Sequence, residues 1–432
     1  MRSRFVLATL LATTLTSLVP VTTPAQDPAP GRAVATRWQL PATDDGLPGA
    51  GPLRQADWFR KLWSERRGGW SKRADADRNA VVMLGDSITQ GWGDDFSGAF
   101  PGVKVANRGI SGDTSRGVLI RLAEDVLALE PRAVVLLIGT NDLEEQADPE
   151  TIAGNVRLIL AELKKGRPGM PVVLCEVFPS SESKKRPSAK IKKLNQLFAG
   201  IVKTEPQVTL IETWKLFADP AGDAKPGEFP DLLHLNRLGY AKWAAALRPV
   251  FATLDLLETE PYQFTPEPGF VSLFNGRDLS GWTTKPPTVP GLEGRVSTPD
   301  GRYVAKNGRL IVTTPPEGHR IQQLWTTRQF SNDFVLRLEF RATPNADSGI
   351  FVRGNQLQCR DYPLAGPYKQ LRNYRSGDWN EVEITVRGGT AFSLCNGEVL
   401  EAAQKVPAVG PVGLEGDCGQ MEYRRLRVRE LP

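Results

Sequence analysis

The stretch Val81-Val-Met-Leu-Gly-Asp-Ser-Ile-Thr89 joins a short apolar run to a polar turn. Continuous apolar runs of this length, rich in Val, Leu and Ile, are typical of strands buried on both faces of a parallel sheet. The predicted strands cover residues 80–84, 103–106, 133–138, 171–177 and 208–211. Helical patterns lie between them, over residues 116–129, 149–165 and 189–203. Strands alternating with helices predict an α/β three-layer sandwich with right-handed crossovers.

Ser87 follows directly on the first of these strands. In open α/β sheets ligands bind at the carboxyl ends of the strands, so this fold would deliver Ser87 to the rim where a substrate could sit. Taken alone, Gly85-Asp-Ser87 is an ordinary turn. A serine hydroxyl is also a poor nucleophile, and it needs a base to take its proton.

His234 is the candidate base. The chain has two histidines, and His319 lies in the C-terminal half with no serine motif nearby. His234 lies near the end of the α/β region, three residues after Asp231. That spacing lets the Asp231 carboxylate reach the far imidazole nitrogen, fix the tautomer and stabilise the imidazolium. The pattern predicts a Ser87–His234–Asp231 triad.

Two further strand ends carry groups suited to an oxyanion. Asn141 lies near the end of the stretch 134–142, at the same rim, where its side-chain amide could donate a hydrogen bond. Gly112 lies in the stretch 107–114, where its backbone N–H could approach the substrate. Donors held in place in this way contribute about 3–4 kcal/mol each in acyl transfer. Asn and Gly are ordinary loop residues singly, and only their joint placement at the rim favours this interpretation.

Four blocks in this order resemble the SGNH hydrolase family, and the similarity covers roughly residues 55 to 255. The blocks are 85–87, 107–112, 139–142 and 231–234, and the sequence of the first two is similar to the platelet-activating-factor acetylhydrolase-like and carbohydrate acetylesterase branch. The resemblance implies a flavodoxin-like sheet of strand order 2-1-3-4-5. It also implies Ser87 as nucleophile, His234 as base, Asp231 as its orienting partner, and an oxyanion hole made by the Ser87 and Gly112 N–H groups with the Asn141 side chain.

The C-terminal half has a different texture. Residues 334–341, 381–387 and 422–429 alternate between apolar and polar side chains, as half-buried strands do. Asn-Gly pairs at 275–276, 307–308 and 396–397 predict hairpin turns. The second domain is therefore predicted to be an antiparallel β-sandwich.

The stretches 269–282, 346–353 and 421–431 resemble a family named for 3-keto-disaccharide hydrolysis, and the similarity covers nearly all of residues 268 to 432. That family has a concanavalin-like, laminin-G-like jelly roll. Members usually carry a Glu-x-Gln pair where this chain has Gln356-Leu-Gln358. Because glycosidic cleavage normally needs a carboxylate, the change argues against such chemistry and favours glycan binding or structural packing. Three tryptophans could stack on sugars or fill the core, and both interpretations stay open: Trp282, Trp325 and Trp379.

Length and composition set the remaining expectations. A chain of 432 residues is too long for one ordinary core. We expect a signal peptide over 1–25, a flexible leader over 26–52, a hydrolase domain over 53–256, a linker over 257–268 and the sandwich over 269–432. Arg2 and Arg4 followed by an apolar run to Val19 predict export, and that run is too short to span a bilayer. A net charge of +5 is too small to indicate nucleic acid as a partner.

The other polar clusters predict less. Two distant histidines and dispersed cysteines give no metal-ligand cluster, and no cofactor is expected. Cys175 lies in an apolar run and is predicted to be buried, whereas at most one pair can form among Cys359, Cys395 and Cys418. The basic stretch 184–193 is expected to lie on a solvated loop and helix face.

The sequence thus predicts a secreted, periplasmic or cell-surface serine esterase that cleaves short acyl esters, acetyl esters of saccharides above all. Two alternatives stay open. One is the same chemistry on lipids, as a lysophospholipase or thioesterase. The other is a surface glycan-binding protein whose hydrolase half is vestigial.

Overall fold

The structure is a computed structural model. It describes residues 38–257, 263–284, 291–313, 321, 323–343, 346–362, 368, 370–417 and 420–432. The predicted signal peptide, His319 and Cys418 lie outside these residues, and the domain boundaries given above remain a prediction. No helix in the described ranges has the length and apolar character needed to cross a lipid bilayer.

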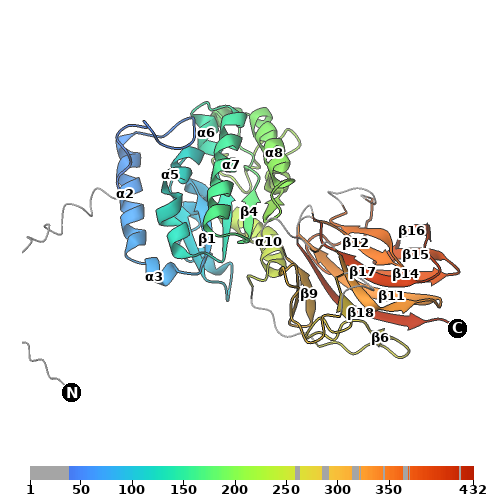
Figure 1. The fold of residues 1–432 in the computed structure, drawn as a ribbon. Helices are drawn as coiled ribbons and strands as arrows, with labels where there is room; N and C mark the ends of the chain where they lie inside the picture. The colour runs from blue at the N-terminus through green and yellow to red at the C-terminus, as the bar shows by residue number, and fades with distance from the viewer. Residues whose placement is uncertain are drawn as a thin grey trace, which may run out of the picture. The chain divides into compact units, whose positions relative to one another are not determined.

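Five parallel strands form the sheet of the α/β part, in the order β2-β1-β3-β4-β5, and Figure 1 labels β1 and β4 among them. This confirms the predicted strand order and places each predicted strand within a few residues. The C-terminal ends of all five strands consequently lie at one edge. The strands are β1 Val81–Gly85, β2 Val105–Gly109, β3 Ala133–Leu137, β4 Val172–Cys175 and β5 Val208–Ile211.

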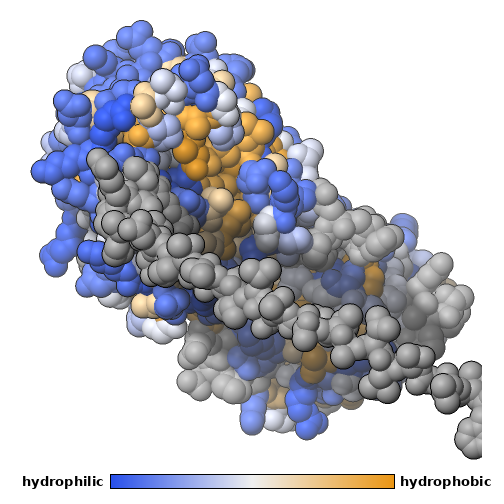
Figure 2. Space-filling view, turned by 60° about the vertical axis from the view of Figure 1, so that its left-hand side comes forward, coloured by the Kyte–Doolittle hydropathy of each residue, from blue (hydrophilic) through white to orange (hydrophobic). Residues whose placement is uncertain are grey.

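Helices cover both faces of this sheet because side chains alternate along each strand. In β1, Val82 and Leu84 pack against helices α5, α7 and α8, whereas Val81 and Met83 pack against α10 and the segment after α4. The helices are α2 Asp57–Ser71, α3 Ala74–Asp77, α4 Ser87–Gly91, α5 Ser115–Asp125, α6 Thr140–Glu144, α7 Pro149–Gly166, α8 Ser188–Val202, α9 Thr213–Phe217 and α10 Arg237–Thr253. Short 3₁₀ turns cover Phe96–Gly98, Leu127–Leu129 and Glu182–Lys184. Hydrophilic side chains cover much of the face seen in Figure 2, around an apolar area.

The prediction of a flexible leader does not hold for residues 40–52. Asn155 of α7 exchanges two hydrogen bonds with the backbone of Ala50, at 3.0 and 2.8 Å. Arg116 of α5 forms an ion pair with Asp44 at 2.7 Å. Leu40 is buried in a cluster with Phe59 of α2. Composition alone suggested flexibility, whereas polar partners on α5 and α7 fix this segment.

Two antiparallel sheets form the C-terminal part, and their inner side chains share one core, as predicted for a β-sandwich. One sheet has the order β13-β12-β17-β10-β7 and the other β16-β15-β14-β11-β18-β9-β8, with β6 paired to β18. The strands are β6 Val271–Ser272, β7 Trp282–Thr283, β8 Tyr303–Lys306, β9 Arg309–Val312, β10 Gln323–Phe330, β11 Phe334–Ala342, β12 Asp347–Val352, β13 Asn355–Arg360, β14 Asn380–Arg387, β15 Thr390–Cys395, β16 Glu398–Lys405, β17 Gly410–Glu415 and β18 Met421–Glu430.

Two of the three predicted Asn-Gly hairpins are present. Asn307-Gly308 joins β8 to β9 and Asn396-Gly397 joins β15 to β16. Asn275-Gly276 does not join paired strands. The Asn275 side-chain oxygen instead accepts hydrogen bonds from the N–H groups of Arg277 and Asp278, so the pair forms a local turn.

Candidate active site

Ser87 lies at the point where β1 passes into helix α4. Asp86 caps this helix, because its Oδ1 atom accepts a hydrogen bond from Ile88 N at 3.0 Å. Asn107, in the middle of β2, holds the other end of α4 by donating to the carbonyls of Thr89 and Gly93, both at 2.9 Å. The helix that carries Ser87 is therefore fixed to the sheet at both ends.

A chain of hydrogen bonds joins Ser87, His234 and Asp231. The His234 Nε2 atom lies 3.0 Å from Ser87 Oγ, and His234 Nδ1 lies 2.8 Å from Asp231 Oδ2. The other carboxylate oxygen of Asp231 accepts from the backbone N–H groups of Leu233 and His234, at 3.1 and 2.7 Å. The structure thus brings together the three side chains that the sequence singled out, 147 residues apart for the Ser–His pair.

The partners of the imidazole decide its tautomer. An ionised carboxylate can only accept hydrogen bonds, so the His234 Nδ1 atom must carry the proton that faces Asp231. The Nε2 atom is then left with a lone pair, and the Ser87 hydroxyl donates to it. In this state the imidazole is ready to remove a proton from Ser87.

The Asp231 carboxylate is ionised over the whole neutral and mildly acidic range. Burial raises the pKa of Asp231. The hydrogen bonds from the His234 backbone, the His234 ring and Leu233 together outweigh this effect and lower the pKa to about 2. The carboxyl group therefore carries its charge at every pH where imidazole chemistry operates.

Helix α10 connects the histidine loop to the serine helix. Asn236 caps α10 by accepting from Gly239 N at 3.0 Å, two residues after His234. Tyr240, one turn into α10, donates to the Ile88 carbonyl of α4 at 2.8 Å. Its ring stacks on Trp92, which also stacks on Trp243, at centroid distances of 5.2 and 4.6 Å. This aromatic packing and the Tyr240 hydrogen bond hold α10, which follows His234, against the segment that follows Ser87.

The two remaining predicted residues, Gly112 and Asn141, meet at Asp113. The Asn141 Nδ2 atom donates to the Asp113 carbonyl at 2.9 Å, which ties the first turn of α6 to the residue after Gly112. Among the described residues the Gly112 N–H has no hydrogen-bond acceptor. Gly112 has a φ of +85°, and an added Cβ would lie 2.5 Å from Trp58 Cη2, so both conformation and space require glycine here.

The sequence profile of the GDSL-like lipase/acylhydrolase family matches residues 83–242. Human platelet-activating factor acetylhydrolase IB subunit alpha2 is 30% identical over 188 residues, which are 42% of this chain and 79% of that protein. The chain belongs to the GDSL-like lipase/acylhydrolase family. The mouse alpha1 subunit is 29% identical over 195 residues, 44% of this chain and 81% of that protein. Membership identifies this acylhydrolase as a carboxylic ester hydrolase.

Two solved structures are similar to the α/β part, and a second family profile matches the C-terminal part. A GDSL-like lipase from Bacteroides thetaiotaomicron is 24% identical, with a TM-score of 0.39, and the match covers 43% of this chain and 97% of that one. A lipase/acylhydrolase from Enterococcus faecalis is 23% identical, with a TM-score of 0.34, and the match covers 43% of this chain and 100% of that one. Residues 269–429 match the 3-keto-alpha-glucoside-1,2-lyase-like domain.

Three residues of this acylhydrolase site were not predicted. Arg186 was placed with its lysine neighbours on a solvated face, but its side chain is only 2% exposed and donates to Asn141 Oδ1 at 3.1 Å. Arg54 and Trp58 lie beside Gly112, with the Arg54 guanidinium 5.5 Å from the Trp58 ring centroid. Nothing in the local sequence separates Arg186 from Lys184 and Lys185, since burial of a cation depends on partners elsewhere in the chain.

Asp86, which precedes Ser87 in the chain, has a fully buried carboxyl group. Burial raises its pKa to about 7, against the hydrogen bond from Ile88, and the nearby Asp113 carboxylate raises it further. Its Oδ2 atom has no hydrogen-bond partner among the described residues. The folded acylhydrolase therefore resists ionisation of Asp86 more than the unfolded chain does.

The Asp86→Asn variant should show the effect of this group on stability. The pKa of Asp86 is higher in the folded protein than in the unfolded chain. The contribution of Asp86 to the free energy of unfolding is therefore fully present below the pKa of the unfolded chain, and it is lost as the pH rises towards about 7. At about 1.4 kcal/mol per pKa unit, the rise from 3.8 to about 7 makes the loss on the order of 4 kcal/mol. The free energy of unfolding, measured by urea titration at several pH values, should therefore rise in the variant relative to wild type between pH 4 and pH 7. A difference that does not change with pH would contradict this account.

The predicted residues of the C-terminal part do not form a comparable site. Gln356 and Gln358 lie on β13. Trp282 is fully buried, so it belongs to the core, whereas Trp325 is half-buried against Phe351 at 4.9 Å. The guanidinium carbons of Arg341 and Arg424 lie 4.8 and 3.9 Å from the centroid of the Trp379 ring. The free thiols of Cys175, Cys359 and Cys395 are all buried, as predicted for Cys175.

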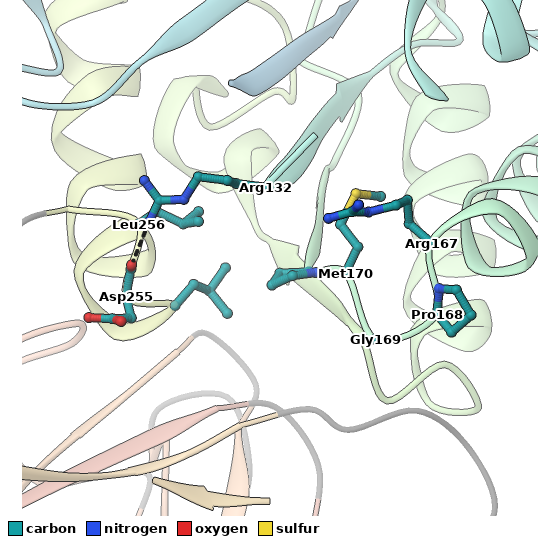
Figure 3. A pocket seen from close by; sticks show the side chains of 9 residues that line it. Arg132, Arg167, Pro168, Gly169, Met170, Asp255 and Leu256 are labelled. Atoms are coloured by element: carbon teal, nitrogen blue, oxygen red, sulfur yellow. Dashed lines mark hydrogen bonds between the residues drawn. The ribbon is translucent and has the colours of Figure 1, made fainter. Parts of the chain in front are cut away.

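The α/β part also has a cavity of about 570 Å³, which is not lined by Ser87, His234 or Asp231 (Figure 3). Arg132 and Met170, which line it, precede β3 and β4, so it opens at the sheet edge opposite Ser87. Arg132 donates to the Asp255 carbonyl there. None of the residues that line this cavity is a serine, threonine, cysteine or histidine. In the described part of the chain no group of three His, Cys, Asp or Glu side chains could hold a metal ion.

Proposed function

We propose that this acylhydrolase cleaves short acyl esters, principally acetyl esters of saccharides, through an acyl-enzyme formed on Ser87. One observation carries the proposal: Ser87, His234 and Asp231 form an unbroken hydrogen-bond chain at the C-terminal edge of the sheet. A vestigial hydrolase would have no need of the matched tautomer and ionised carboxylate that this chain provides.

The reaction proceeds in two acyl transfers. His234 Nε2 takes the hydroxyl proton as Ser87 Oγ bonds to the ester carbonyl carbon. The Gly112 N–H, the Ser87 N–H and the second Nδ2–H of Asn141 stabilise the oxyanion. The intermediate collapses, the ester C–O bond breaks, and His234 returns its proton to the departing alcohol. Water then gives a proton to His234 and its oxygen to the acyl carbon, which releases the carboxylic acid and restores the Ser87 hydroxyl.

Two observations support the choice of substrate. The curated relatives are named as acetylhydrolases, which favours a short acyl group. Trp58 is 51% exposed beside Gly112, and Arg54 covers one face of its ring. An exposed indole next to the reacting carbonyl suits stacking against a sugar ring on the alcohol side of the ester. The similarity of residues 269–429 to a glucoside-directed domain agrees with a saccharide substrate and with glycan binding by that part.

Substrate choice is tested with Trp58→Ala. We expect KM for an acetylated xylo-oligosaccharide to rise about five- to tenfold, because stacking contributes about 1 kcal/mol, while KM for ethyl acetate, which has no ring, stays nearly constant. Leu158→Ala on α7, another exposed apolar residue, serves as the control. Equal effects on both substrates, or activity on lysophospholipids and long-chain thioesters alone, would instead favour a lipid hydrolase.

Export is part of the proposal. Arg2, Arg4 and the apolar run that follows support a signal peptide over residues 1–25. The enzyme would then act outside the cytoplasmic membrane, where acetylated polysaccharides are found. Mass spectrometry of the N-terminus of exported protein tests this, and retention of residues 1–25 would contradict it.

A further inference from the structure

Arg186 uses its guanidinium to bind the first turn of α6. The Nε atom donates to the carbonyl and hydroxyl oxygens of Thr140, both at 3.0 Å. The Nη2 atom donates to Asn141 Oδ1 at 3.1 Å and to Glu144 Oε2 at 3.0 Å. The Nη1 atom donates to the Lys184 carbonyl at 2.6 Å. The position of this buried guanidinium is therefore determined mainly by its hydrogen bonds to α6.

These contacts determine which way the Asn141 amide faces. A guanidinium has only donors, so the Asn141 atom beside Arg186 must be the oxygen. The Asp113 carbonyl only accepts, so the atom beside it must be the nitrogen. With one N–H of Nδ2 used by Asp113, the second remains for the substrate. The positive charge on Arg186 also draws electron density towards Asn141 Oδ1, which strengthens Nδ2 as a donor.

An ion-pair chain continues from Arg186 to Gly112. Glu144 accepts from Arg186 and also from Arg54 Nη2, at 3.0 and 2.9 Å. Arg54 Nη1 lies 3.2 Å from the position that a Cβ on Gly112 would occupy. Glu144 therefore joins one arginine that contacts Asn141 to another that lies over Gly112.

We propose that Arg186 is a positioning residue for the oxyanion hole, which fixes and polarises the Asn141 amide through its hydrogen bond to Oδ1. This rests on the proposed function, in which Asn141 and Gly112 hold the oxyanion. The oxyanion exists only in the transition state and intermediate. Loss of Arg186 should therefore lower kcat and leave KM nearly unchanged.

The test is a double-mutant cycle with p-nitrophenyl acetate, in which Arg186→Met is introduced into wild type and into Asn141→Ala. We expect Arg186→Met to lower kcat about tenfold in wild type, as partial loss of one oxyanion donor, and less than about twofold in the Asn141→Ala background. Lys185→Met, an exposed cation in the same loop, removes the same charge and should leave kcat unchanged. Far-UV circular dichroism melts check that each variant is folded.

Arg186→Lys keeps the cycle decisive if the methionine variant does not fold. Lysine keeps the charge, but its single ammonium cannot reach Thr140, Asn141 and Glu144 together, so kcat should fall again only when Asn141 is present. An equal loss in both backgrounds, or a loss confined to KM, would overturn the positioning role. If Asn141→Ala by itself left kcat unchanged, the oxyanion hole of the proposed function would be wrong, which is a different result.

Discussion

Replacing Ser87 by alanine should lower kcat for p-nitrophenyl acetate by about 10⁵-fold, because the acyl-enzyme can no longer form. The variant keeps the oxyanion donors, so a small activity above the uncatalysed rate should remain. The fold should be unaffected, since Ser87 is half-buried and its hydroxyl bonds only to His234 among the described residues. Initial rates at saturating substrate measure this directly.

Ser71→Ala supplies the matched control for that experiment. Ser71 is exposed at the end of α2, and its hydroxyl donates to the Gly68 carbonyl of the same helix. Its activity should equal that of wild type. Equal rates for Ser87→Ala and wild type on every ester tried would point to a glycan-binding protein with a vestigial hydrolase half.

Asp231→Asn should lower kcat by about 10³- to 10⁴-fold while the backbone geometry persists. The amide oxygen can still accept from Leu233 N and His234 N, as Asp231 Oδ1 does. The amide nitrogen would then face His234 Nδ1 and donate to it. The imidazole proton would move to Nε2, facing Ser87, so the ring could no longer accept the hydroxyl proton.

The pH profile separates this explanation from a general loss of charge. Because the pKa of Asp231 is about 2, its ionisation contributes nothing to the wild-type profile above about pH 4. The Asp231→Asn defect should therefore persist across the neutral range and be moderated only at high pH, where hydroxide replaces the base. Asp75→Asn, a fully exposed carboxylate of α3, should behave as wild type. A defect in Asp231→Asn that vanishes near neutral pH would contradict the tautomer argument.

The fold, and the hydrogen-bond contacts among Ser87, His234 and Asp231, could be predicted because both depend on local patterns. Apolar runs separated by helical patterns define a parallel sheet, and the C-terminal ends of its strands must share an edge. Ser87, Asn141 and the Gly112 loop each follow such a strand, so their placement at the same edge of the sheet could be predicted without knowledge of strand pairing. The Asp231–His234 contact was predictable from a separation of three residues.

What could not be predicted depends on distant partners. The side chain of Arg186 is buried because it donates hydrogen bonds to Thr140, Asn141 and Glu144 of α6. Its sequence neighbours Lys184 and Lys185 gave no sign of this burial. Residues 40–52 are ordered by Asn155 and Arg116, which lie up to 105 residues away. The pairing of β18 between β11 and β9 likewise joins segments that local alternation cannot rank.

The most direct test of the central claim is covalent labelling with diethyl p-nitrophenyl phosphate. Attack by an activated serine releases p-nitrophenolate and leaves a diethylphosphoryl group on the attacking oxygen. We expect one adduct per chain by intact mass, loss of esterase activity in proportion to labelling, and assignment of the adduct to Ser87 by peptide mapping. An active esterase that is labelled at another residue, or inactivated with Ser87 unmodified, would contradict the account.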